Sequence, residues 1–161
     1  MLLWDYVSEG WEEPLSALPI ERRRAISLEA ISVALDSFRP SFEALFSQET
    51  VSFVRQTMLR CRGLIKGEGG EGIGSEEFFD TLHSLPDRDS ALGLTSLVMA
   101  ISTYVDCLGG EMSAADTLEV MSASYEAVLN SERIPRVTPD TERQNDNCVR
   151  LIEIQRRLVV G

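Results

Sequence analysis

The chain has 161 residues, the size of one ordinary domain, which is long enough to bury a core without disulfides or metals. Apolar residues make up 43% of the sequence and charged residues 25%, with six Pro and eleven Gly, so the composition excludes a disordered or fibrous chain. The formal net charge of −11 argues against direct binding of nucleic acid, because each phosphate contact needs a Lys or Arg.

The N-terminal part of the chain shows apolar patterns with the helical period of about 3.6 residues. A first long helix is predicted over 20–38, and Pro40 ends it because its ring nitrogen cannot donate a hydrogen bond. Ser47 is expected to cap a second helix that stops at Gly67. The expected apolar face of this second helix consists of Val51, Val54, Met58, Cys61 and Ile65.

The middle of the chain begins with the segment 67–74, in which five of eight residues are glycine, so we expect a flexible loop there. Ser75 is expected to cap the short helix that follows. Asp87 or Asp89 then starts a central apolar helix, which is too short and too polar to span a membrane. We expect Gly109-Gly110 to end it in a left-handed cap.

Two more helices are predicted in the final part of the chain. Residues 113–116 resemble a capping box with Asp in place of Glu, and the residue pair Thr138 and Pro139 places Pro at the first position of the last helix. No internal repeat or β-strand alternation is present. The sequence therefore predicts an all-α fold: a single domain over 1–161, built as a bundle of about six to seven helices with the flexible loop at 67–74.

The three cysteines, Cys61, Cys107 and Cys148, lie far apart, and each is set among apolar residues. This pattern indicates reduced core thiols, not a disulfide framework or a zinc site. The first residues of the chain lack the basic region and the long apolar region of a secretory signal. We therefore expect a soluble, cytoplasmic protein.

The negative charge is concentrated in the middle of the sequence. Residues 1–66 carry nine acids and eight bases, and residues 133–161 carry four acids and six bases. Residues 67–132 carry thirteen acids and one base, Arg88. Such segregation costs self-repulsion, which a cationic partner would offset. A charge that serves only solubility is the alternative explanation.

The basic residues are almost all Arg, and their one run is Arg22 to Arg24. Glu21 and Glu29 flank this run, which indicates ion pairing along an exposed helix face, not a patch that binds nucleic acid.

The acidic middle predicts a surface that binds a basic protein, without a catalytic residue, a cofactor, nucleic acid or a membrane. Seven acids are the candidate partner-binding residues: Glu76, Glu77, Asp80, Asp87, Asp89, Asp116 and Glu119. A DNA-mimicking or structural module that displaces nucleic acid from a basic protein is a further hypothesis for the same charge.

A different hypothesis is a carboxylate metal site, or an enzyme built on one. Glu76, Asp80 and His83 are spaced by four and three residues, so their side chains share one helix face. A ferritin-like centre needs a second Glu-x-x-His, but His83 is the only histidine. Nucleophilic catalysis would likewise depend on His83 as its only base.

Two segments carry a resemblance to known proteins. Residues 18–25, followed by an Ala-rich helix to Phe46, and residues 87–94, leading into a helix of small residues, resemble the bacterial YjaG-like helical family and related immunity proteins of polymorphic toxin systems. No catalytic motif is shared. The resemblance implies an all-α bundle and, in the immunity branch, a protein that neutralises a cognate toxin by tight binding. An acidic inhibitor suits this role, because nuclease toxins need basic surfaces for their substrate.

Overall fold

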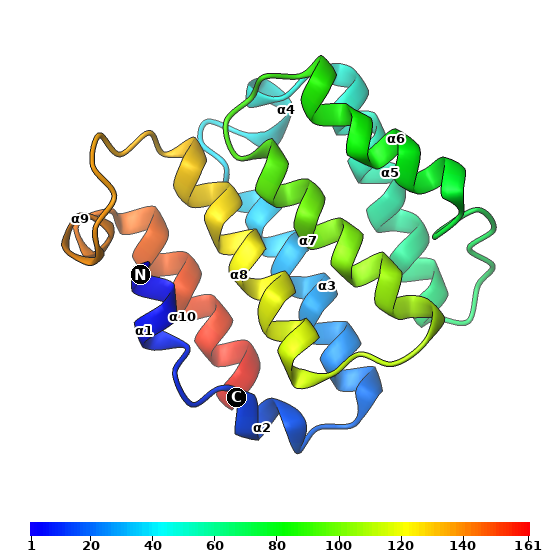
Figure 1. Cartoon of the computed structure of the whole chain (residues 1–161), viewed down its shortest axis with the longest axis horizontal. Coiled ribbons are helices and arrows are strands. Elements are labelled where there is room, and N and C mark those ends of the chain that lie inside the picture. The colour runs from blue at the N-terminus through cyan, green and yellow to red at the C-terminus, as the bar shows by residue number, and fades with distance from the viewer.

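The computed structural model describes residues 1–161 and contains helices and their connections, without a strand (Figure 1). Ten α-helices occur, with a short 3₁₀ helix, η1, between α7 and α8. Their bounds are α1 Leu3–Val7, α2 Glu12–Ser16, α3 Ile20–Ser37, α4 Phe42–Leu45, α5 Gln48–Ile65, α6 Glu76–Arg88, α7 Leu94–Asp106, η1 Cys107–Gly109, α8 Ala114–Ser131, α9 Pro139–Arg143 and α10 Asp146–Val160.

The all-α prediction is confirmed, but six to seven helices is an undercount. The difference lies in the short helices α1 and α2 and in the last predicted helix, which is divided into α9 and α10. Asn145 starts α10 separately, because its side chain accepts the backbone N–H of Cys148 at 2.9 Å. None of the helices combines the length and apolar character that a membrane span requires.

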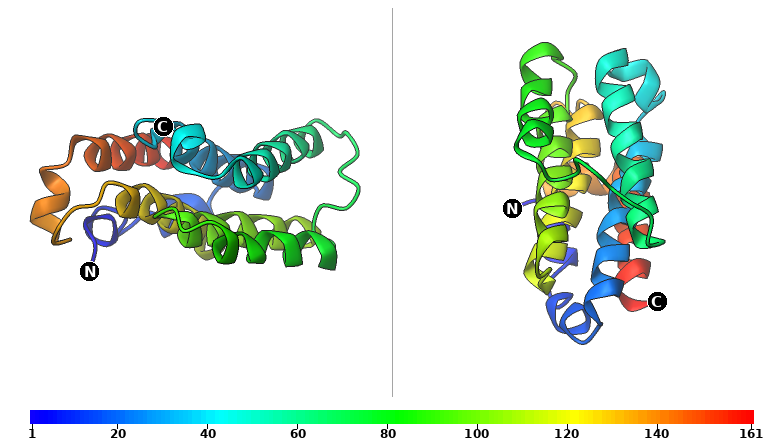
Figure 2. Two further views of the ribbon diagram at one scale, coloured as in Figure 1. Left: turned by 90° about the horizontal axis from the view of Figure 1, so that it is seen from above. Right: turned by 90° about the vertical axis from the view of Figure 1, so that its right-hand side faces the viewer.

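The long helices form two layers (Figure 2). One layer holds α10, α3 and α5, and the other holds α8, α7 and α6. The α7 and α8 helices pack along most of their length, and α3 crosses behind them from the other layer. Tyr104 of α7 and Tyr125 of α8 are among the largest fully buried side chains. This packing fixes which faces of α6, α7 and α8 remain on the surface.

Serine side chains fix the starts of three helices as predicted. Ser47, Ser75 and Ser113 cap α5, α6 and α8, each accepting a backbone N–H three residues ahead. At α8 the cap is reciprocal, because the Asp116 carboxylate accepts the N–H of Ser113 at 2.9 Å. The predicted capping box is therefore confirmed.

Two predicted boundaries of the central helix are wrong. α7 begins at Leu94, not at Asp87 or Asp89. The carboxylate of Asp89 instead accepts the backbone N–H of Ser47 at 2.8 Å, at the start of α5. At the other end, Gly109-Gly110 does not form a left-handed cap, because the chain continues into η1 and the second glycine has φ −160°.

The loop 67–74 links α5 to α6, and its residues Gly67, Gly72 and Gly74 have positive φ. The apolar face predicted for α5 is buried at Val54, Met58 and Cys61. It is only half-buried at Val51, and at Ile65 the prediction is wrong, because this side chain is 55% exposed.

The close approach of α7 to α8 depends on one glycine. Gly93 caps α7 in the left-handed conformation, with φ 93° and ψ −9°. A Cβ at this position would lie 2.1 Å from the carbonyl oxygen of Ala127 on α8. A side chain here would meet both the strain of positive φ and a clash with fixed backbone.

We predict that Gly93→Ala lowers the free energy of unfolding by about 2–4 kcal/mol, because the two helices must separate to admit the methyl group. Urea unfolding followed by circular dichroism measures the change. Gly69→Ala is the control, because a Cβ at Gly69 would meet nothing within 4 Å. Equal losses of stability in the two variants would contradict this role for Gly93.

Candidate functional site

Most acids in the middle of the chain have no ion-pair partner. Of the thirteen acids in residues 67–132, Glu132 alone takes part in a salt bridge. Arg88, the one base in this stretch, pairs with Glu49 of α5. The charge of the middle segment is therefore largely uncompensated by ion pairs.

Three of the unpaired carboxylates meet in a groove of about 460 Å³ between α6, α7 and α8. Asp106 ends α7, whereas Asp116 and Glu119 lie in the first turns of α8, three residues apart and so on one face. The groove, called here the acidic groove, is lined by Phe79, His83, Ser102, Thr103, Asp106, Cys107, Asp116 and Glu119. The turn between α7 and α8 brings these acids together.

The three acids differ in how their carboxylates interact with the dipoles of their helices. Asp116 and Glu119 lie near the N-terminus of α8, where the helix dipole favours negative charge. Asp106 lies at the C-terminus of α7, where the dipole disfavours a carboxylate, and it has no ion-pair partner. An added cation would therefore stabilise the charge of Asp106 more than that of Asp116 or Glu119.

His83 and Ser102 also line the acidic groove. The Nε2 atom of His83 on α6 lies 3.0 Å from Oγ of Ser102 on α7. The His83 ring also stacks on Phe79, with 6.0 Å between ring centroids. These contacts hold the α6 wall of the groove against α7.

Cys107 lines the same groove as the three acids, and their charge affects the pKa of its thiol. Burial raises the pKa of the Cys107 thiol to about 11, and the negative charges of Asp116, Asp106 and Glu119 add to the rise. The side chain is only half-buried, so a reagent in solution can reach it.

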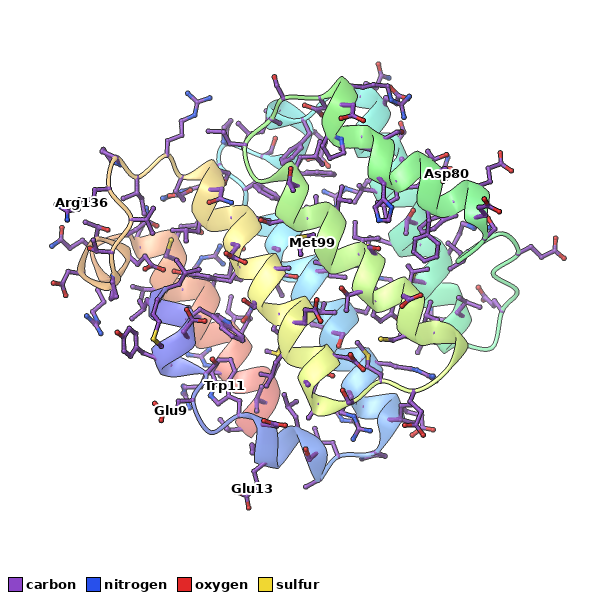
Figure 3. All side chains as sticks on the ribbon, viewed as in Figure 1. Glu9, Trp11, Glu13, Asp80, Met99 and Arg136 are labelled. Carbon is purple, nitrogen blue, oxygen red and sulfur yellow. The ribbon has the colours of Figure 1, made fainter.

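The seven acids predicted from the sequence do not form one surface. Asp116 and Glu119 lie in the acidic groove. Glu76 and Asp80 are exposed on α6, seven and three residues before the His83 that lines the groove, so they extend its charge along that helix. Figure 3 labels Asp80 on this helix. Glu77 instead shares a hollow with Arg60 of α5.

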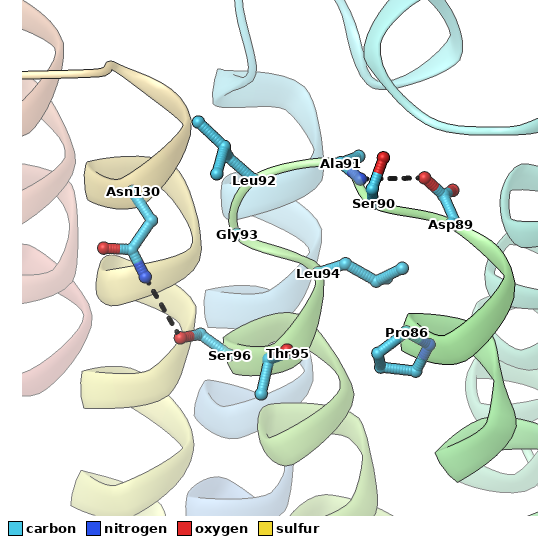
Figure 4. A pocket seen from close by; sticks show the side chains of 10 residues that line it. All are labelled: Pro86, Asp89, Ser90, Ala91, Leu92, Gly93, Leu94, Thr95, Ser96 and Asn130. Carbon is cyan, nitrogen blue, oxygen red and sulfur yellow. Dashed lines mark hydrogen bonds between the residues drawn. The ribbon is translucent and has the colours of Figure 1, made fainter.

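Asp87 and Asp89 lie at the far end of α6, away from the groove. Asp87 is exposed, whereas Asp89 has a structural role. Its carboxylate accepts the backbone N–H of Ser47 at 2.8 Å. It also accepts the backbone N–H of Ala91 at 3.0 Å (Figure 4). Burial alone would raise the pKa of Asp89, but these hydrogen bonds outweigh it and lower the pKa. We therefore remove Asp89 from the candidate site.

Sequence reasoning missed Asp106, which is central to the groove. A signal was present, because Asp106 is the only charged residue in α7 and directly precedes the turn to α8. The pattern within one helix grouped His83 with Glu76 and Asp80, whereas the structure places it opposite the acids of α7 and α8.

The metal hypothesis finds no ligand set in the structure. Glu76, Asp80 and His83 do not form a metal-binding group, and no cluster of three or more His, Cys, Asp or Glu elsewhere in the chain does so. The acids of the groove are suited to hydrogen bonding and to pairing with a cationic side chain.

Searches against protein-family models, curated proteins and solved structures found no match.

Glu132 is the one acid of residues 67–132 that forms a salt bridge. It links α8 to the α3–α4 connection and to α10. Its carboxylate accepts hydrogen bonds from Arg39, Asn145 and Asn147. Burial alone would raise the pKa of Glu132, but these partners outweigh it and lower the pKa. A folded-state pKa below the unfolded value means that the stabilisation is present at neutral pH and is lost as pH falls through the folded pKa.

We predict that Glu132→Gln lowers the free energy of unfolding by about 1–2 kcal/mol at neutral pH, a range that allows for the partly exposed Arg39. The difference from the native chain shrinks at acidic pH, as pH falls through the lowered folded-state pKa of Glu132 and its side chain loses its charge. Urea unfolding at neutral and at acidic pH measures the change. Glu153→Gln, which removes only exposed ion pairs with Arg156 and Arg157, serves as the control without loss of stability. A difference that persists at low pH would contradict the ionic role.

A second prediction uses Cys107 to test whether the acids converge. Removing two charges with Asp106→Asn and Glu119→Gln should lower the Cys107 pKa and speed its alkylation by iodoacetamide about two- to fivefold at about pH 8. Peptide mass spectrometry separates this thiol from the buried Cys61 and Cys148.

The control for this experiment is Glu12→Gln with Glu13→Gln, which neutralises two exposed acids of α2. It changes the net charge equally but should leave the Cys107 rate unchanged. If both double variants react at the native rate, the charges of Asp106 and Glu119 do not reach the thiol.

Proposed function

We propose that the protein is an immunity or antitoxin-like binding protein, which neutralises a basic effector through the acidic groove and the exposed acids of α6. One observation carries the proposal: twelve of the thirteen acids in residues 67–132 have no salt bridge, and three of them line one groove. Like charges so placed repel each other, and a cationic side chain of a partner relieves the repulsion.

The groove suits an arginine or lysine of the partner. A guanidinium between Asp106 on one wall and Asp116 or Glu119 on the other would donate to both walls at once. Phe79 offers an aromatic surface beside these acids, on which a guanidinium also packs well. Glu76 and Asp80 add to the field that steers the partner toward the groove.

The resemblance of residues 18–46 and 87–94 to immunity proteins favours a toxin as the effector. A nuclease toxin is a suitable target, since its substrate-binding surface is basic and an acidic inhibitor can cover it. The proposal includes a bacterial, cytoplasmic protein, because an immunity protein acts inside the cell that it protects.

We predict that reversing two groove charges, with Asp106→Lys and Glu119→Lys, weakens binding of the basic partner at least about tenfold. The partner is captured on the immobilised native chain at about 50 mM salt, identified by mass spectrometry, and measured by calorimetry with each variant. The matched control is Glu12→Lys with Glu13→Lys, which changes the net charge by the same amount on α2. Equal affinity for the two double variants would exclude the groove as the interface.

Salt dependence and competition separate the remaining alternatives. Affinity should fall clearly between about 50 and about 500 mM salt, and a constant affinity would refute the electrostatic mechanism. A specific inhibitor binds one stoichiometric effector. A DNA mimic would instead compete with duplex DNA for unrelated DNA-binding proteins, and that result would replace the immunity proposal.

A further inference from the structure

A second hollow, separate from the acidic groove, is lined by residues from the C-terminal ends of α5 and α7 and from the first turns of α3. Figure 1 shows these three helix ends on the same side of the molecule. It has a volume of about 320 Å³ and shares no lining residue with the groove. Its lining consists of Glu21, Arg24, Leu64, Ile65, Tyr104 and Leu108. Four of these six residues are hydrophobic, so the walls are largely apolar.

Two buried polar atoms at this pocket have no hydrogen-bond partner. One is the hydroxyl of Tyr104, a residue that is only 1% exposed. The other is Nε of Arg24, although the same guanidinium donates from its terminal nitrogen to the carbonyl of Gly110 at 2.5 Å. Buried polar groups are almost always paired, and an acceptor on a bound ligand would satisfy these two donors at one pocket.

The chemistry of the lining defines that acceptor. Arg24 supplies a positive charge and an N–H, and burial raises the pKa of Tyr104, so the phenol stays protonated and also donates. Glu21 on the same lining disfavours a second negative charge on the ligand. A monoanion therefore fits better than a phosphate.

We propose that this pocket binds a small amphipathic monocarboxylate, whose carboxylate accepts hydrogen bonds from Arg24 and Tyr104. The aliphatic or aromatic part of the ligand lies on Leu64, Ile65 and Leu108. Such a ligand covers the side chain of Ile65, which is 55% exposed at the end of α5. The two polar atoms are covered from solvent, so binding requires a local displacement of the side chains above them.

The experiment titrates octanoate into the full chain labelled with ¹⁵N and follows amide chemical shifts. Saturable shifts that centre on Arg24, Ile65, Tyr104 and Leu108 are expected. The matched probe is 1-octanol, which has the same chain without the charge, and it should bind at least about fivefold more weakly. Absence of saturable shifts up to about 10 mM octanoate overturns the proposal.

Tyr104→Phe tests the polar contact with little risk to the fold, because it removes a hydroxyl that has no partner. Thermal unfolding should be unchanged, and octanoate affinity should fall about five- to tenfold. Octanoate binding that is equal in Tyr104→Phe, or equal to that of octanol, would show unspecific apolar contact and overturn the proposal. Asp106→Asn with Glu119→Gln should leave octanoate affinity unchanged, which keeps this test independent of the acidic groove.

Discussion

The packing of α7 against α8 is the constraint on which the rest of the structure depends. Gly93 lets the start of α7 approach the backbone of Ala127, and the buried small residues Ala100 and Ala123 lie further along the two helices. Because the helices are antiparallel and joined by a short turn, the end of α7 and the start of α8 are neighbours. This arrangement places Asp106, Asp116 and Glu119 in the acidic groove.

The arginines of the N-terminal part explain why the acids remain unpaired. The predicted ion pairing along the run Arg22 to Arg24 is wrong, because Arg23 donates to the carbonyl of Met112 at 2.7 Å and Arg24 to that of Gly110. Arg39 is held by Glu132. Arg23, Arg24 and Arg39 are thus used to fix backbone turns and helix ends, and none of them forms an ion pair with a carboxylate of the acidic groove.

Local rules predicted the features that depend on a few neighbouring residues. The serine caps and the buried faces of the long helices follow from spacing alone, since both are decided within one or two turns. Asp89 could not be assigned in this way, because its partner Ser47 is 42 residues away and no local pattern links them. The position of Asp106 and Asp116 in one groove, and the exposure of Ile65, likewise depend on how helices pack.

The end of α7 joins the two proposed sites through one charge. Asp106 stands against the helix dipole there, and Arg24 binds the carbonyls of Cys107, at 3.5 Å, and Gly110 just beyond it. The Arg24 guanidinium therefore stabilises the C-terminal end of α7, which the Asp106 carboxylate destabilises. In the two proposals, a cation therefore binds on the Asp106 side of this helix end and an anion on the Arg24 side.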